Sequence, residues 1–90
     1  MRAYASPLLP FAGSQYDSPE RLAARRQVND WIVGGGKFDA VVRLDRAVAD
    51  PADPARLLPA FDTGDHLHPN AAGYRRMADV VDLSLFRGRP

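Results

Sequence analysis

A single strong helix pattern between two short apolar stretches most constrains the fold of this chain. Ser18 can cap a helix, Pro19 suits the first helical position, and the glycines at 34–36 can end it. The segment 2–6 is short, with mostly small and aromatic residues, and predicts a short strand; the segment 38–44 has a short apolar, partly β-branched centre, as in a parallel strand covered on both faces. Strand, helix and strand in this order predict a β-α-β unit, in which the two strands are parallel.

Two apolar stripes define the expected core. In the first helix, apolar residues recur at i, i+4, i+7 and i+8, whereas Arg25 is expected on the opposite, solvent-facing side. A second helix is expected after Pro69, again with apolar residues at helical spacing. The two stripes consist of Ala24, Val28, Trp31 and Ile32 in the first helix, and of Tyr74, Met77, Ala78 and Val81 in the second.

Residues 46–63 are expected to form a long loop. They contain Ala-Asp-Pro twice in succession, and Asp-Pro pairs are typical of turns. A short helical turn is predicted over 46–49, and Leu57, Leu58 and Phe61 are expected to anchor the loop. The chain therefore reads β-α-β-loop-α, an α/β layer structure, with a polar tail at 87–90 that is expected to fray.

Composition excludes several classes of function. The net charge of +1 and the scattered arginines give no basic patch, so no nucleic-acid partner is expected. No apolar run approaches the ~18 residues of a membrane span, and prolines interrupt the apolar N-terminus, which argues against a signal peptide. Location is therefore open, with the cytoplasm as the default. The chain has no cysteine, and no cofactor motif is expected.

The segment 64–70 holds both histidines and carries the chemistry. A residue before proline is held out of helical geometry, so His68 is expected to be extended just ahead of the second helix. Asp65, three residues earlier, can accept the proton on Nδ1 of His68 and leave Nε2 free as a general base. An alternative is a metal site that combines Asp65 with His66 and His68, because two histidines flanking one residue point the same way on an extended segment.

The pattern Asp65-x-x-His68-Pro69 resembles the last sequence block of the SGNH (GDSL-type) hydrolases, which are serine esterases. The segments 8–11, 25–32, 38–42 and 65–74 are similar, in order and spacing, to the C-terminal portion of bacterial members. The resemblance covers residues 2–86 and weighs against the metal site. It implies a flavodoxin-like three-layer α/β/α fold with parallel strands, and it implies that Asp65 is the triad acid and His68 the triad base. The substrates it implies are small-molecule esters or acylated carbohydrates.

The chain departs from this family in one respect. The Gly-Asp-Ser block that carries the nucleophile, and the glycine and asparagine blocks of the oxyanion hole, do not occur in residues 1–90. We therefore expect residues 1–90 to be one partial domain, from a truncated gene, a misplaced start or an excised piece, and to be inactive or nearly so in isolation. Ser6, at the exit of the first strand, is the only serine with a conceivable position as a substitute.

The competing prediction is a non-catalytic interaction module, or the complementing half of a split hydrolase. Two strands and two helices leave sheet edges and apolar helix faces uncovered, which would favour self-association.

Overall fold

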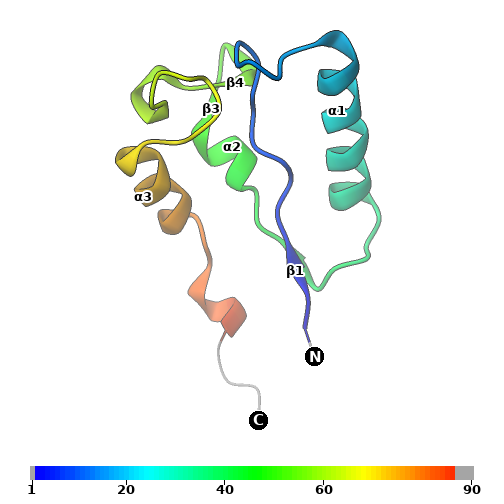
Figure 1. The fold of residues 1–90 in the computed structure, drawn as a ribbon. Helices are drawn as coiled ribbons and strands as arrows, with labels where there is room; N and C mark the ends of the chain where they lie inside the picture. The colour runs from blue at the N-terminus through cyan, green and yellow to red at the C-terminus, as the bar shows by residue number, and fades with distance from the viewer. Residues whose placement is uncertain (1, 87–90) are drawn as a thin grey trace.

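The two strands that flank α1 in the sequence pair in parallel. The computed structural model describes residues 2–86, so Met1 and the polar tail at 87–90 lie outside the described residues. Strands β1 (Tyr4–Ala5) and β2 (Ala40–Val41) are parallel, and α1 (Pro19–Gly34) connects them. Figure 1 shows α1 on one side of β1 and α3 on the other. The predicted β-α-β unit is confirmed, although its strands are shorter than expected.

The start of α1 follows the prediction, but its buried face does not. The Ser18 hydroxyl accepts a hydrogen bond from the backbone N–H of Arg21 at 3.1 Å, as a capping serine should. Within the expected apolar stripe, Ile32 is buried, whereas Trp31 is 53% exposed and Val28 is 41% exposed. The prediction that Trp31 is a core residue is therefore wrong.

Polar side chains on α1 explain this rotation, because they hold the main chain of Leu8. Asn29 accepts from the Leu8 N–H at 2.7 Å and donates to the Leu8 carbonyl at 3.1 Å. Arg25 donates from Nε to the same carbonyl, also at 3.1 Å. An extended segment offers unpaired main-chain groups, and these two side chains satisfy them. Arg25 therefore faces the body of the protein, and its predicted place on the solvent-facing side is wrong.

Residues 44–57 contain more regular structure than a loop. A short helix, α2 (Leu44–Val48), lies close to the predicted helical turn and takes the residues expected to end the second strand. It is followed by an antiparallel hairpin of β3 (Ala49–Asp50) and β4 (Asp53–Leu57). The sequence pattern missed this hairpin because Pro54 lies inside β4, and proline is tolerated only at an edge or at the start of a strand. The first Asp-Pro pair does form a turn, in which Asp50 accepts from the Ala52 N–H at 2.9 Å.

The buried core is small and lies where the segment 10–14 meets α2 and β4. Leu57 is 4% exposed, as expected of an anchor, and the N–H of Ala12 donates to the carbonyl of Ala55 at 2.9 Å. In the described part of the chain, no helix is long and apolar enough to cross a membrane. The buried apolar side chains among residues 2–86 are Pro7, Pro10, Ala12, Ile32, Val48, Leu57 and Pro69.

The second predicted helix is α3 (Ala71–Asp79), which packs on the 3-10 turn η1 (Pro59–Phe61). Asn70 caps it by accepting from the Gly73 N–H at 2.9 Å. Gly73 is buried and Met77 half-buried, whereas Tyr74 is 55% exposed, so the expected role of Tyr74 as an anchor is wrong. The packed face of α3 differs from the predicted stripe because the close contact with Phe61 and Pro69 forms at Gly73.

A second 3-10 turn, η2 (Leu83–Phe86), returns the chain to β1. The Tyr4 hydroxyl donates to the carbonyl of Leu85, and the rings of Tyr4 and Phe86 meet edge to face at 5.5 Å between centroids. The two ends of the described chain are therefore held together by an aromatic pair and a hydrogen bond.

Two helical glycines predict opposite effects of the same substitution. A Cβ at Gly73 would lie 2.8 Å from the Phe61 carbonyl oxygen and 2.9 Å from Cβ of Pro69, whereas a Cβ at Gly34 meets nothing within 4 Å. We expect Gly73→Ala to lower the free energy of unfolding by about 1–3 kcal/mol through overpacking. Gly34→Ala should raise it by up to about 1 kcal/mol through helix propensity. Urea unfolding followed by circular dichroism measures both, and equal effects of the two variants would contradict this account of α3 packing.

Candidate active site

Both histidines lie on a closed loop between η1 and α3. The base of the loop is an antiparallel bridge between Asp62 and Pro69, supported by a hydrogen bond from the N–H of Thr63 to the carbonyl of His68 at 3.1 Å. The loop turns tightly because Gly64 has a φ of +112° and His66 a φ of +62°. A left-handed conformation is uncommon for a histidine and indicates that the surrounding hydrogen bonds impose it. In Figure 1 this yellow segment lies at the N-terminal end of α3.

Asp65 and His68 are brought together as predicted. Nδ1 of His68 lies 2.6 Å from Oδ2 of Asp65. The other carboxylate oxygen of Asp65 accepts from the N–H groups of Leu67 and His68, both at 2.9 Å, and from the Thr63 hydroxyl at 2.8 Å. The hydrogen bond to the His68 ring, followed by those from the main chain and from Thr63, holds the pKa of Asp65 well below its usual range.

A second pair, Asp62 and His66, has the same arrangement and precedes the first pair in the chain. Nδ1 of His66 lies 2.7 Å from Oδ2 of Asp62, and Oδ1 of Asp62 accepts from the N–H groups of Gly64 and His66 at 2.8 and 3.0 Å. The Asp62 side chain is only 6% exposed. Burial alone would raise the pKa of Asp62, but the hydrogen bonds from Gly64 and His66 outweigh it and lower the pKa.

The two pairs differ in what they leave accessible. The His68 side chain is 63% exposed and Asp65 is 47% exposed, whereas His66 is 48% exposed over a buried carboxylate. Among residues 2–86, Nε2 of His68 makes no hydrogen bond, since the only ring contact of His68 is through Nδ1. An imidazole oriented by a carboxylate at Nδ1, with Nε2 open, can take up a proton as a general base.

The alternative metal site of Asp65, His66 and His68 is not assembled. The two rings direct Nδ1 to two different carboxylates, and no group of three or more histidine, aspartate or glutamate side chains in the described part of the chain is placed to share an ion. The loop therefore builds two separate acid–base pairs.

The segment 8–17 reaches this loop at Gly13. A Cβ on Gly13 would lie 3.5 Å from Cγ of His66 and 2.8 Å from Nη1 of Arg56, so glycine allows the chain to pass close to both side chains. Gly13 has a φ of +89°, and its N–H donates to Asp17 at 2.7 Å. The His66 ring thus lies beside both the Asp62 carboxylate and Gly13, whereas the His68 ring is the more exposed of the two.

Three of the four serines of the chain are engaged in local hydrogen bonds. The hydroxyl of Ser6 donates to the carbonyl of Pro7 at 3.2 Å, Ser14 accepts from the N–H of Tyr16, and Ser18 caps α1. Ser6 lines an apolar cavity with Val42, Val81 and their neighbours, and His68 is not among the residues lining that cavity. The structure therefore does not bring Ser6, the one serine considered as a substitute nucleophile, to the base.

Sequence reasoning missed Asp62 and Thr63. Asp62 lies at i−4 from His66 and two residues before a glycine, a spacing at which an aspartate can accept from the N–H of residue i+2 in an Asx turn. Thr63 lies two residues before Asp65. Short-range aspartate and threonine spacings were thus a usable signal, but they predict turn formation in general and do not single out a histidine partner.

Comparison with known proteins adds no family assignment. A scan against protein-family models gave no match for this chain, and a search of curated proteins gave none either. What the loop does must therefore be inferred from its residues.

The two pairs can be tested by titration. Because the His68 ring contributes most to lowering the pKa of Asp65, we expect His68→Ala to raise the pKa of Asp65 toward the usual value of about 3.9. His66→Ala should instead raise the pKa of Asp62 and leave Asp65 unchanged. Carboxyl ¹³C shifts followed by NMR from pH 1 to 7 report each group separately. A change in the pKa of both Asp62 and Asp65 in either variant would show that the pairs are not independent.

Linkage gives the sign of the pH dependence. The pKa of Asp65 is lower in the folded chain than in the unfolded chain, so the pair contributes stability that is fully present above pH ~4 and is lost as the pH falls through the folded-state pKa. The loss of stability on acidification should therefore be smaller in His68→Ala than in the unmodified chain, as measured by urea unfolding between pH 2 and 6. An unchanged acid slope would contradict the pairing.

Proposed function

We propose that this chain supplies the acid and the base of a serine ester hydrolase of the SGNH type. The observation that carries the proposal is the 2.6 Å contact between Oδ2 of Asp65 and Nδ1 of His68, which leaves Nε2 of an exposed ring free. The main chain and Thr63 hold the carboxylate in place before any substrate arrives. Pre-organised orientation of this kind is what a triad acid contributes to its histidine.

The proposed reaction uses His68 twice. Its Nε2 takes the proton from a serine hydroxyl as the serine oxygen forms a bond to the ester carbonyl carbon, and then returns that proton to the departing alkoxide as the ester bond breaks. A water molecule then attacks the acyl-serine by the same proton transfers, which releases the carboxylic acid. Asp65 stays ionised throughout and stabilises the imidazolium form of His68. The substrate class is an ester of a small molecule or an acylated carbohydrate.

The serine and the oxyanion hole must come from outside residues 1–90, since no Gly-Asp-Ser block occurs within them. We propose the finer fold accordingly: the C-terminal part of a flavodoxin-like three-layer α/β/α domain. The parallel pair β1–β2, with α1 on one side of β1 and α3 on the other in Figure 1, supports this placement. The position of His68 just before α3 agrees with it.

A second candidate function is a non-catalytic interaction module, which includes a complementing half of a split hydrolase. The exposed apolar residues of α1 favour it, because Val28 and Val33 are 41% and 43% exposed and Trp31 is 53% exposed. Val28 and Trp31 are three residues apart and share one face of α1, and exposed apolar side chains on a helix face are suited to association with another polypeptide or with a second copy. The second candidate depends on the exposed apolar residues of α1, whereas the first depends on His68.

Hydrolysis of p-nitrophenyl acetate by the pure chain is the first test. We expect no saturable turnover beyond that of His68→Ala at the same concentration, because neither the Gly-Asp-Ser block nor the oxyanion-hole blocks occur in residues 1–90. Saturable turnover that disappears in His68→Ala would contradict this expectation of an inactive chain.

The role of the pair is tested in a chain that includes a nucleophile. Coding sequence upstream of Met1 with an in-frame Gly-Asp-Ser block would supply it, and the longer product can then be assayed. There, His68→Ala and Asp65→Asn should each lower kcat by about a thousandfold or more. His66→Ala, the matched control, should retain most activity because Asp62 and His66 form their own pair. Equal losses for His66→Ala and His68→Ala would refute the assignment of His68 as the base.

A further inference from the structure

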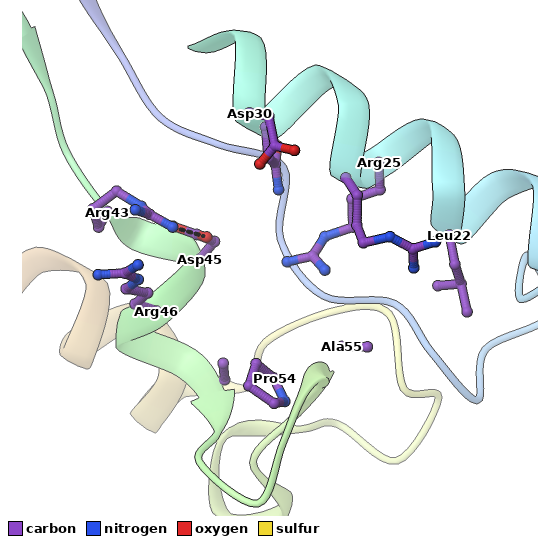
Figure 2. A pocket seen from close by; sticks show the side chains of 11 residues that line it. Leu22, Arg25, Asp30, Arg43, Asp45, Arg46, Pro54 and Ala55 are labelled. Carbon is purple, nitrogen blue, oxygen red and sulfur yellow. Dashed lines mark hydrogen bonds and ion pairs between the residues drawn. The ribbon is translucent and has the colours of Figure 1, made fainter. Parts of the chain in front are cut away.

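A cavity of about 360 Å³ lies between α1 and the segment that runs from β2 to β4. Figure 2 shows α1 on one side of it, carrying Arg25, and α2 on the other side, with the paired Arg43 and Asp45. None of the four residues of the two acid–histidine pairs lines it. The charged residues that line the cavity are Arg25, Arg26, Asp30, Arg43, Asp45 and Arg46.

One carboxylate in this lining is already neutralised. Asp45 is 5% exposed and receives two hydrogen bonds from Arg43, one from Nε at 3.0 Å and one from Nη2 at 2.9 Å. Burial would raise the pKa of Asp45, but the hydrogen bonds and charge of Arg43, with the N–H of Arg46 and the charge of Arg25, lower it. The fork-to-fork pair is therefore a neutral, fixed part of the wall.

The remaining charges of the lining are unbalanced. The lining also holds three arginines, Arg25, Arg26 and Arg46, and one further carboxylate, that of Asp30. Within residues 2–86, none of these four side chains forms an ion pair within 4.0 Å. The lining thus carries a net charge of +2. Burial lowers the pKa of Arg25, and repulsion from Arg26 and Arg43 lowers it further against the attraction of Asp45. The excess of positive charge in the lining favours an anion from outside.

We propose that this cavity binds the phosphate dianion of a small molecule. A phosphate monoester carries a charge of about −1.5 to −2 at pH 7, which matches the excess charge of the lining. Guanidinium groups bind phosphate oxygens through two parallel hydrogen bonds, and they reach this cavity from two different elements, α1 and α2. The volume falls within the range of about 300–1,000 Å³ typical of small-ligand pockets.

Other anions fit less well. A monocarboxylate would neutralise only half of the excess charge. A nucleic acid needs a basic stripe along an extended surface, whereas the net charge of the whole chain is only +1 and the excess here is limited to the four arginines around one cavity. The dianionic small molecule is the class that meets both the charge and the size of the site.

Titration of the pure chain with inorganic phosphate, at constant ionic strength and followed by ¹H–¹⁵N NMR, tests the proposal. We expect saturable shifts at residues of α1 and α2, and weaker binding of acetate under the same conditions. Glucose 6-phosphate, titrated in parallel, distinguishes the source: tighter binding than phosphate indicates an organic phosphate, and weaker binding indicates free phosphate. The absence of saturable binding by both phosphates would overturn the proposal.

Matched variants separate the cavity from general electrostatics. Arg26→Gln and Arg46→Gln each remove a lining guanidinium, and we expect each to weaken phosphate binding about tenfold or more. Arg75→Gln, on the exposed part of α3, removes the same charge from outside the cavity and should leave the affinity unchanged. Native-like spectra of the three variants verify that they fold. Equal weakening by all three variants, or equal affinity for acetate and phosphate, would refute a specific site.

Discussion

The candidate site depends on two carboxylates, those of Asp62 and Asp65, each of which binds the main chain through one oxygen and a histidine ring through the other. In both Asp62 and Asp65, Oδ1 accepts two backbone N–H groups while Oδ2 faces the Nδ1 of a histidine. The main-chain bonds fix where the carboxylate lies, and the carboxylate then fixes the ring. Because the loop itself positions its acids, the orientation of His68 does not rely on distant packing. The buried Asp62 shapes the loop, and the more exposed Asp65 serves the ring that projects outward.

The rest of the described chain also relies on polar contacts where a larger domain would use apolar ones. Few apolar side chains are fully buried, and α1 is held to Leu8 by Asn29 and Arg25 rather than by Trp31. Hydrogen bonds to an extended main chain are directional, so they define the position of α1 while burying little area. This arrangement keeps polar residues of α1 against the body and leaves three of its apolar residues, Val28, Trp31 and Val33, in contact with solvent.

Local signals in the sequence predicted local structure well. The cap at Ser18 and the helix after Pro69 appear where expected, and so does the contact between Asp65 and His68, since each depends on residues within a few positions of one another. Which helix face is buried depends on partners distant in the sequence, and there the apolar spacing misled, at Trp31 and again at Tyr74. The β3–β4 hairpin was hidden by Pro54, which an isolated two-stranded sheet tolerates because each strand is an edge. Asp62 was missed because its contact with the His66 ring depends on the left-handed backbone conformation of His66, which the sequence of the loop does not predict.

The orientation of α1 links its exposed apolar residues to the arginine-lined cavity. Because Asn29 and Arg25 turn toward Leu8, the arginines of α1 are directed to α2, where Asp45 is already committed to Arg43. Had the helix buried Val28 and Trp31 instead, Arg25, which is now half-buried, would have been carried toward solvent and away from α2. The same rotation that exposes the apolar residues of α1 therefore concentrates positive charge in the cavity. One set of hydrogen bonds to Leu8 thus determines both the surface open to a polypeptide partner and the cavity open to an anion.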